Sequence, residues 1–415
     1  MLKIIKRKLF RKCLCERSLH FWCQRGLIMD DLRKSIVGKK TLKWDGKDPD
    51  LSLTLPSRYF YDEEIFRREI DTIIYPSWHF VCHKSEISNV GDFVKFDILK
   101  ESVLVIRAED GNVNAMHNVC KHRGTQLIQE RRGNIKNMIT CPYHAWSYHL
   151  NGNLRHAPRC ETMKGFSKDD WGLSKVRVEE FAGFYFINFD TNASSLADDI
   201  PGAYEAMSPY FPDLGEITFI EEVDMMVDAN WKVIVDNAIE GYHFKLSGPH
   251  HKDLAALIDF DKYELNAHGK WWDFKGPPVP TKTAFGEIVE GQTYQTDWFY
   301  NIQLWPMTTI YAFPYADAIG TFNEIPIGAE KTLLRFGHYI PKNRPQNKLS
   351  KAAINWFNEK LGPEDIDLNL YVQQGLHSSG FDQGRYMIDA ERSSNSEHLL
   401  HHFHSLVFKA LNNDA

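Results

Sequence analysis

The sequence predicts an α+β protein in which an all-β module is set within a larger domain of mixed strands and helices. Residues 78–190 hold short runs of aromatic and β-branched residues that are separated by turn signals. The residues after 190 alternate strand-like runs with stretches of helical periodicity. A polar arm with one helical stretch precedes the β-rich module. The module is therefore expected to be an insertion within the larger domain.

Length and composition exclude several classes of protein. The chain has 415 residues, a formal net charge of −6 and seven cysteines. This length predicts two domains at roughly 150 residues each. A mildly acidic balance argues against generic nucleic-acid binding, which depends on a basic surface. No run approaches about 18 consecutive apolar residues, so we expect no membrane span. The cysteines are too sparse for a disulfide scaffold.

Residues 1–28 differ from the rest of the chain because they contain eight basic residues and a single acid. They have three interpretations: an organelle transit peptide, an amphipathic helix that binds a surface, or an over-called start with translation beginning at Met29. The lack of a secretory apolar region and cleavage site favours the last. The rest of the chain then carries −13, and we expect a cytoplasmic protein.

The predicted elements follow from local periodicity. Residues 29–77 form an arm of the larger domain, and a helix is predicted at 62–75, where isoleucines recur near helical spacing. In the β module, residues 78–190, Asp110 and Gly111 mark a hairpin turn. The strands of this module are expected within 78–87, 91–99, 102–119 and 183–190. In the second domain, residues 191–415, strands are expected at 218–229, 309–316 and 331–341, and helices near 231–246, 349–361 and 363–376.

The β module contains two short groups of metal-ligand residues. Cys120 and His122 form a C-x-H group, and Cys141 and His144 form a C-x-x-H group, with 18 residues between the two groups. Zinc fingers usually pair cysteine with cysteine and histidine with histidine, although a Cys2His2 zinc site remains an alternative. The mixed pattern suits a [2Fe-2S] cluster with two cysteines on one iron and two histidines on the other.

Segment 120–148 resembles the Rieske iron–sulfur signature. The resemblance includes Pro142, Tyr143 and Trp146 around the second ligand loop. Ala145 occupies a position where the family commonly has glycine, which we expect to trim the space beside the cluster. The resemblance implies that Cys120, His122, Cys141 and His144 hold a Rieske cluster.

A second group of candidate ligands lies in the second domain. Glu240 and His243 are three residues apart and are expected to share one face of the 231–246 helix. Gly248-Pro249 is expected to break this helix and to turn a following histidine back toward the same site. Asp365 lies one turn into a predicted helix and offers a carboxylate, although an acid there could simply complement the helix dipole. Two histidines and one carboxylate suit Fe(II) and leave positions open for O2.

The segments 230–243 and 364–376 resemble the catalytic half of the Rieske non-heme iron oxygenase α subunits. The resemblance covers nearly everything from about residue 51 to 408 and implies a Rieske domain inserted in a helix-grip (START-like) catalytic domain built on an antiparallel sheet. By position, it assigns His243 and Asp365 to a mononuclear Fe(II), Glu240 to a bridge between metal centres across a subunit boundary, and Asn237 to a place near the iron.

The sequence departs from the family pattern at two points. The family usually has its second iron histidine five residues after the first, but position 248 is glycine here. His250 and His251 are the alternatives, and we favour His251. The bridging residue is more often aspartate than glutamate. Glu240 is similar to the branch that contains carnitine and related quaternary-amine monooxygenases.

The resemblance implies a terminal oxygenase that uses O2 and electrons from an NAD(P)H-dependent flavin or iron–sulfur reductase, as a homotrimer. The favoured substrate is a quaternary or methylated amine, hydroxylated beside nitrogen. One alternative is an aromatic-ring hydroxylating oxygenase, and another is a Rieske electron carrier fused to a ligand-binding domain. Residues 271–322 could form an aromatic cage for a methylammonium group or simply pack the sheet. Their aromatic residues are Trp271, Trp272, Phe274, Phe285, Trp298, Phe299, Tyr300, Trp305, Tyr311, Phe313, Tyr315 and Phe322.

Overall fold

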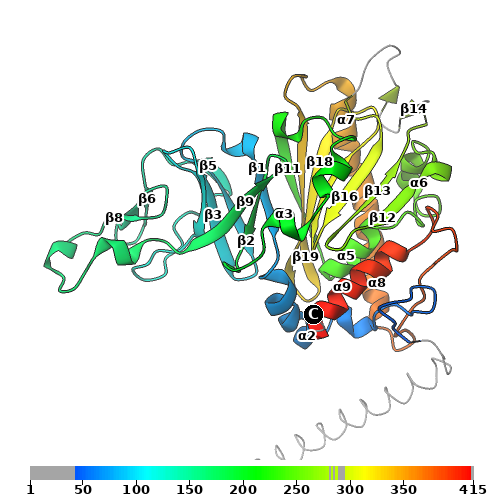
Figure 1. Ribbon diagram of the computed structural model, residues 1–415, viewed down its shortest axis with the longest axis horizontal. Helices are drawn as coiled ribbons and strands as arrows, with labels where there is room; N and C mark the ends of the chain where they lie inside the picture. Colours follow the sequence, from blue (N-terminus) through cyan, green and yellow to red (C-terminus); the bar gives the residue numbers. More distant parts are fainter. Residues whose placement is uncertain (1–42, 280–281, 284–285, 288–294, 413–415) are drawn as a thin grey trace, which may run out of the picture.

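The computed structural model describes residues 43–279, 282–283, 286–287 and 295–412. Two seven-stranded antiparallel sheets dominate it, and the first projects from the side of the second (Figure 1). Helices α5, α8 and α9 lie across the second sheet. The expected α+β class, with a β module inserted in a larger domain, is confirmed. The basic segment 1–28 lies outside the described residues.

The N-terminal arm belongs to the second domain. Its predicted helix is confirmed as α2 (Glu63–Glu69), which continues into the π-helix η2 (Ile70–Ile74). The Asp62 side chain accepts hydrogen bonds from the first-turn backbone N–H groups, which explains why the helix begins there. Glu69 at its end is fully buried, accepts a hydrogen bond from the Trp231 indole and forms an ion pair with Lys232, whose Nζ lies 2.6 Å away. The arm also contains η1 (Ser57–Phe60).

The first sheet contains all four strand regions predicted for the β module. The predicted hairpin is confirmed between β3 and β4, where Gly111 has a φ of 84° and Asp110 accepts a hydrogen bond from the Asn112 N–H. In spatial order the strands are β1 (His79–His83), β10 (Phe184–Asn188), β9 (Lys175–Phe181), β4 (Val113–His117), β3 (Glu101–Arg107), β2 (Asp92–Ile98) and β5 (Arg132–Asn134).

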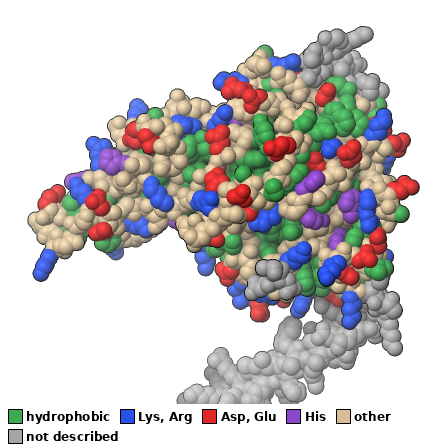
Figure 2. Space-filling model, in the orientation of Figure 1, with side chains coloured by type: hydrophobic (Ala, Val, Ile, Leu, Met, Phe, Trp, Pro, Cys, Tyr) green, Lys and Arg blue, Asp and Glu red, His purple; other side chains and the backbone are tan. Residues whose placement is uncertain are grey.

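A small three-stranded sheet lies at the far end of this module, away from the second sheet (Figure 1). Its strands are β6 (Ile139–Thr140), β7 (Ser147–Tyr148) and β8 (Leu154–His156). The module as a whole forms a narrow projection, and Lys and Arg side chains are spread along it (Figure 2). Its short 3-10 helices are η3 (Lys84–Ile87), η4 (Cys160–Thr162) and η5 (Lys168–Trp171).

The second sheet carries the concave face on which the helices pack. Its strands, in spatial order, are β11 (Ile217–Val227), β19 (Lys331–Pro341), β18 (Ile319–Gly328), β17 (Thr308–Ala312), β16 (Phe299–Leu304), β13 (Trp271–Gly276) and β12 (Glu264–Ala267). The helices are α3 (Leu196–Asp199), α4 (Ala203–Met207), η6 (Leu214–Glu216), α5 (Trp231–Ala238), α6 (Pro249–Ala255), η7 (Phe260–Lys262), α7 (Lys348–Trp356), η8 (Phe357–Leu361), α8 (Gly362–Leu376) and α9 (His398–Asn412). A two-stranded sheet pairs β14 (Lys282–Thr283) with β15 (Gly286–Glu287).

The prediction of a helix at 231–246 is wrong for its second half. Helix α5 ends at Ala238, and Ile239 leaves the helical conformation with φ −106° and ψ 12°. Glu240 and His243 therefore lie in an irregular turn and do not share a helix face. Gly248-Pro249 does not break a helix but begins one, because Pro249 is the first residue of α6.

An ionic junction joins the two sheets where they meet. Glu222 of β11 accepts hydrogen bonds from Arg131 at 3.1 and 2.9 Å and from Arg132 at 2.9 Å, and Arg335 of β19 lies 3.4 Å away. Arg132 also donates to Glu86 at 3.0 Å. Although burial opposes it, these guanidiniums hold the pKa of Glu222 at about 2. The projecting module is thereby fixed to an edge of the second sheet.

The concave face of the second sheet also buries an acid. Glu324 of β18 is fully buried, and its register partner on β19 is Leu334. Neither carboxyl oxygen of Glu324 has a hydrogen-bond partner among the residues that the structure describes. Burial raises the pKa of Glu324 to about 8, and the neighbouring Gln303 amide lowers it only in part. This acid is therefore expected to be protonated at neutral pH.

Candidate metal centres

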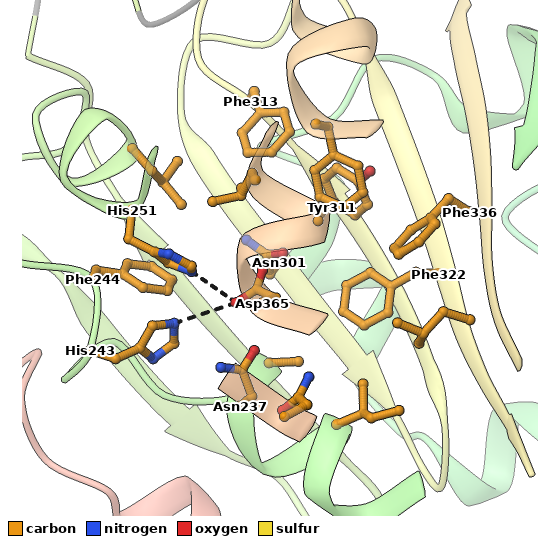
Figure 3. A pocket seen from close by; sticks show the side chains of 18 of the residues that line it. Asn237, His243, Phe244, His251, Asn301, Tyr311, Phe313, Phe322, Phe336 and Asp365 are labelled. Carbon is orange, nitrogen blue, oxygen red and sulfur yellow. Dashed lines mark hydrogen bonds and ion pairs between the residues drawn. The ribbon is translucent and has the colours of Figure 1, made fainter. Parts of the chain in front are cut away.

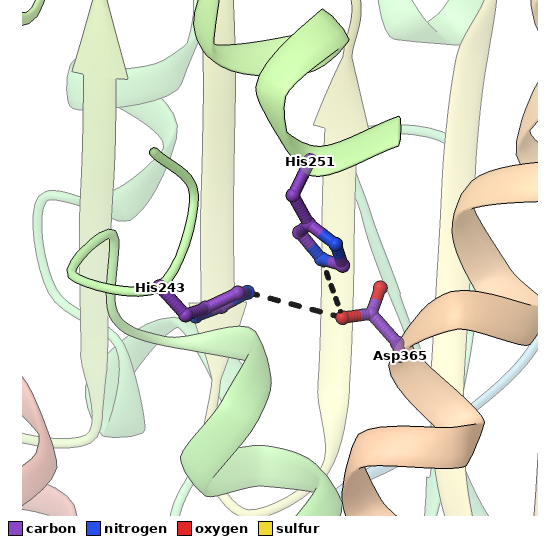
Figure 4. Close-up of side chains that lie close together, drawn as sticks. All are labelled: His243, His251 and Asp365. Carbon is purple, nitrogen blue, oxygen red and sulfur yellow. Dashed lines mark hydrogen bonds and ion pairs between the residues drawn. The ribbon is translucent and has the colours of Figure 1, made fainter. Parts of the chain in front are cut away.

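Three of the candidate ligands in the second domain come together in space. His243, His251 and Asp365 each present one ligand atom, and these atoms lie within 4.8 Å of one another. Oδ1 of Asp365 is 2.8 Å from Nε2 of His251 and 3.9 Å from Nε2 of His243 (Figure 4). The side chain of His251 is 1% exposed. We call these three residues the triad.

Each triad residue comes from a separate element. His243 lies in the turn that follows α5, His251 in the first turn of α6, and Asp365 in the first turn of α8. Asp365 was expected one turn into a helix begun by Pro363. Instead, α8 follows directly from the π-helix η8, so the chain is already helical when it reaches Pro363.

The second ring nitrogen of each triad histidine faces a carboxylate. Nδ1 of His243 pairs with Glu240, and Nδ1 of His251 pairs with Glu364. An Nδ1–H that donates to a carboxylate leaves the lone pair on Nε2, which is the tautomer that a metal ion requires. Nε2 of His243 is buried and has no hydrogen-bond partner in the described part of the chain. The donor set of two imidazoles and one carboxylate fits Fe(II).

Glu364 is a functional candidate that the sequence reasoning missed. It was considered only as a complement to the N-terminus of its own helix, but it lies at the N-terminus of α6. Its carboxylate accepts the backbone N–H groups of His250 at 3.2 Å and His251 at 3.1 Å. A Cβ at Gly248 would lie 2.3 Å from the Glu364 carboxyl carbon, so only glycine admits this contact. In the sequence, the position of Glu364 directly before Asp365 was the observation that could have indicated a role beside the metal site.

The structure separates the two alternative histidines. Nδ1 of His250 lies 3.7 Å from Asp253 of its own helix, and its ring faces Trp356 at a centroid distance of 6.5 Å. His251, by contrast, points at Asp365. The geometry therefore brings the favoured residue, His251, into the triad and leaves His250 outside it.

The two ligand loops of the β module lie side by side. Cys120 and Cys141 are buried, and Sγ of Cys120 lies 3.2 Å from the Tyr148 hydroxyl. The rings of His122 and His144 are 4.6 Å apart between centroids. Nδ1 of His144 is buried without a hydrogen-bond partner in the described residues. Two buried thiols and two adjacent imidazoles, one with an unpaired inward nitrogen, fit a Rieske cluster.

The second ligand loop is shaped to hold a thiolate. Although burial alone would raise it, the pKa of Cys141 is lowered by the backbone N–H groups of Tyr143 and His144. Ala145 is exposed and has a φ of 57°, a left-handed conformation that glycine adopts more easily. The family glycine is therefore explained by backbone conformation, and the expected loss of space beside the cluster stays a prediction.

Comparison with known proteins agrees with both centres. Residues 77–167 match the family model of the Rieske [2Fe-2S] domain, and residues 214–412 match the ring hydroxylating alpha subunit (catalytic domain). The carnitine monooxygenase oxygenase subunit of Escherichia coli (strain K12) is 37% identical over 361 residues, which are 87% of this chain and 94% of that protein. The chain belongs to the Rieske non-heme iron oxygenase α subunits.

Two further relatives place this α subunit within the family. The quaternary ammonium Rieske monooxygenase CntA, in its crystal structure with L-carnitine, is 33% identical with a TM-score of 0.79, covering 90% of this chain and 99% of that chain. The chloroplastic choline monooxygenase of Atriplex hortensis is 26% identical over 374 residues, covering 87% of this chain and 78% of that protein. This Rieske oxygenase subunit is therefore an oxidoreductase with a [2Fe-2S] cluster and a mononuclear iron, and it depends on a reductase partner.

A cavity of about 80 Å³ lies against the triad of this oxygenase (Figure 3). Asn237, expected near the iron, lines it together with Asn301 and Asn369. The other lining residues are mainly aromatic: Phe244, Phe274, Phe299, Tyr311, Phe313, Phe322, Phe336 and Phe357. The triad residue Asp365 is the single acid, and no Lys or Arg occurs, among the described lining residues.

The aromatic residues expected from 271–322 divide between the cavity and the sheet. Phe274, Phe299, Tyr311, Phe313 and Phe322 line the cavity. The other described residues of that set pack elsewhere: Trp271, Trp272, Trp298, Tyr300, Trp305 and Tyr315. Phe285 lies outside the described residues. Part of this region therefore lines the cavity and part packs the sheet, and its use as a cage for a methylammonium group stays a prediction.

The histidines of α9 have structural roles in this subunit. His404 is buried, and its Nε2 lies 3.0 Å from Asp236. His401 and His402 hydrogen-bond backbone carbonyl groups at 2.6 and 2.7 Å. Within the part of the chain that the structure describes, none of the helices has the length and apolar character needed to cross a bilayer.

Proposed function

We propose that this protein hydroxylates a quaternary or methylated amine at a carbon beside nitrogen, which leads to oxidative N-demethylation or to another C–N bond cleavage. The cavity beside the triad carries the proposal, because eight aromatic side chains line it and no Lys or Arg does among the described lining residues. Aromatic faces attract a desolvated ammonium group by about 2 kcal/mol or more. The names of the similar carnitine and choline monooxygenases support the same substrate class.

We also propose the residues that hold the two metal groups. His243, His251 and Asp365 would bind the iron, and Cys120, His122, Cys141 and His144 would bind the cluster. When bound, the iron would provide the site for activating O2, and the cluster would provide electrons one at a time. Glu240 and Glu364 hold the triad histidines in the tautomer that exposes Nε2. His251 is 1% exposed, whereas the Asp365 side chain is 27% exposed, so the triad is open to solvent on the Asp365 side.

A head-to-tail homotrimer is part of this proposal, because the module with the cysteines projects away from the triad of its own chain (Figure 1). An electron therefore needs a route to a neighbouring subunit, and Glu240 beside His243 is the proposed bridge from His144 of that neighbour. Exposed apolar side chains lie near both ends of the route and support a contact between copies: Tyr143, Met163 and Trp171 on the module, and Tyr242 and Leu246 beside Glu240.

The type of reductase, the cellular compartment and the domain boundaries expected from the sequence are also part of the proposal. The electron donor is an NAD(P)H-dependent flavin or iron–sulfur reductase, and the protein acts in the cytoplasm. The Rieske domain spans 78–190, between an arm at 29–77 and a catalytic domain at 191–415. The two separate sheets, one within 79–188 and the other within 217–341, support these boundaries.

A substrate panel with a reductase and NADH tests the function. We expect O2 consumption coupled to release of an amine or an aldehyde from trimethylammonium compounds. Formation of a diol or a phenol from arenes, with no turnover of amines, contradicts the proposal and favours ring hydroxylation. Two irons per chain rather than three, with no turnover, favours an electron carrier.

The variant Glu240→Gln tests the bridge separately. It keeps the size of the side chain but removes its charge. Iron is expected to bind more weakly, because the His243 ring loses its charged acceptor, so the variant is measured at saturating iron with both metal groups bound. Under that condition we expect reoxidation of the reduced cluster by substrate and O2 to slow at least about tenfold. Asp253→Asn is a control on an exposed acid near the same loop. An unchanged reoxidation rate in Glu240→Gln contradicts the bridging role.

A further inference from the structure

Two asparagines in the cavity have unused hydrogen-bonding groups. Asn301 and Asn369 are 6% and 2% exposed and line the cavity beside the triad. The side-chain NH2 group of each is buried and has no hydrogen-bond partner among the described residues. Buried polar groups in folded proteins are nearly always paired, so two unpaired amides in one cavity indicate that a ligand supplies the partner.

The two amides come from different walls of the cavity. Asn369 lies one turn after Asp365 on α8, so it is next to the proposed iron ligand along the helix. Asn301 lies on β16 of the sheet, opposite Tyr311 in the strand register. A ligand atom bound between the two amides therefore lies close to the triad, with Asn369 of the helix on one side and Asn301 of the sheet on the other. Figure 3 shows Asn301 and Asp365 in the same cavity.

The Tyr311 hydroxyl is also buried without a hydrogen-bond partner among the described residues, and the ring of Tyr311 lines the cavity, but the hydroxyl is directed differently from the two amides. The ring lies over Gly320 of the next strand, where an added Cβ would be 2.0 Å from ring carbon Cζ and 2.3 Å from the hydroxyl oxygen. The hydroxyl is thus directed across β18, away from the β16 side of Tyr311. Its ring contributes to the aromatic wall, and the donors for a ligand oxygen are the two amides.

The charge of the cavity decides how an oxygen is bound there. Among the described lining residues no Lys or Arg is present, so neutral amides take the place of a cation. We propose that Asn301 and Asn369 hydrogen-bond an oxygen function of the substrate, so that the enzyme selects a quaternary amine bearing a hydroxyl or carboxylate over one with a purely hydrocarbon substituent. This inference rests on the proposed function and specifies its substrate class.

The test compares three trimethylammonium compounds in the reconstituted holoenzyme. L-Carnitine carries a hydroxyl and a carboxylate, choline carries a hydroxyl, and butyltrimethylammonium carries no oxygen. We expect kcat/KM for at least one oxygen-bearing compound to exceed that for butyltrimethylammonium by about tenfold to a hundredfold. The ratio of carnitine to choline tells whether the oxygen is a carboxylate or a hydroxyl.

Two variants assign this selectivity to the amides. Asn301→Leu and Asn369→Leu keep the approximate shape of the side chain but remove its hydrogen-bonding groups, so the ratio of the oxygen-bearing to the oxygen-free compound is expected to fall toward one. Thr321→Val is the matched control, because Thr321 is buried with an unpaired hydroxyl. Thr321 is adjacent to the cavity residue Phe322 on the same strand, so its side chain points to the opposite face of the sheet. This variant is expected to keep the wild-type ratio.

The outcomes are distinct. If the asparagine variants lower kcat/KM for all three compounds by the same factor, the amides have a structural role and the inference is wrong. Equal kcat/KM values for the three compounds in the wild-type enzyme also overturn it. If none of the three is oxidised while an arene is, the proposed function itself fails, and the inference fails with it.

Discussion

Glu324 offers a direct test of how the catalytic domain accommodates an unpaired buried acid. The side chain is fully buried on β18, and neither carboxyl oxygen has a partner among the described residues. Burial raises its pKa from the ordinary value of 4.5 to about 8. The variant Glu324→Gln keeps the shape of the side chain and removes its titration.

The expected effect follows from linkage. A carboxyl with a higher pKa in the folded than in the unfolded chain binds its proton more tightly when folded. The free energy of unfolding therefore falls as the pH rises from 4.5 to about 8, and it is constant with respect to this group outside that window. At about 1.36 kcal/mol per pKa unit, the wild-type protein loses about 5 kcal/mol across the window.

The assay measures thermal unfolding of wild type and variant at about pH 5.5 and about pH 8.5. We expect the variant to gain stability relative to wild type as the pH rises. An infrared band of a protonated carboxyl should also be present in wild type at neutral pH and absent in the variant. Glu109→Gln is the control, because Glu109 is exposed. Parallel stability curves for wild type and Glu324→Gln refute the reasoning.

Three further substitutions test the metal site and the domain junction. Asp365→Ala should lower the iron content by one atom per chain and abolish turnover, because the triad loses its carboxylate, while the visible absorption of the cluster remains. Glu364→Gln should weaken iron binding about 10- to 100-fold, because the His251 ring loses its charged acceptor; equilibrium dialysis measures this. Glu222→Gln should destabilise the protein by about 1.5–3 kcal/mol, because the partly buried guanidiniums of Arg131 and Arg132 lose their shared charged acceptor; thermal unfolding measures this.

Each of these predictions has a contrary result. Turnover by Asp365→Ala removes that residue from the metal site. Unchanged iron affinity in Glu364→Gln shows that His251 is oriented by packing alone. A Glu222→Gln variant with the stability of wild type shows that Arg131 and Arg132 find other acceptors. Glu216→Gln is a control for the last case, because its pair with Lys342 is exposed.

The sequence predicted which candidate ligands come together in space, because metal chemistry restricts residue type and spacing. Cys120 and Cys141 each stand within three residues of a histidine, and the structure places the two groups together. The iron site required a ligand from far along the chain, and the family resemblance supplied Asp365. The strands were largely predicted because β-branched and aromatic runs between turns are a local signal, although the strand expected at 309–316 ends at Ala312.

Other features depend on tertiary contacts that spacing does not reveal. The end of α5 at Ala238 was missed because Glu240 and His243 also have the spacing of a helix face. The role of Glu364 depends on the close approach of Gly248, which lies more than a hundred residues earlier. The three-residue spacing predicted that Glu240 and His243 lie close together, but an irregular turn rather than a helix brings them into contact.

The buried pair of Glu69 and Lys232 has a consequence for how the chain folds. These residues flank the Rieske domain in sequence, and the arm that carries Glu69 also packs on α9 near the C-terminus. During synthesis the Rieske domain can fold first, whereas the catalytic domain can complete its folding only after both the N-terminal arm and α9 have been made. A fragment that begins after the Rieske domain would leave Lys232 buried without its acid. Separating the two redox domains therefore requires an internal deletion rather than truncation.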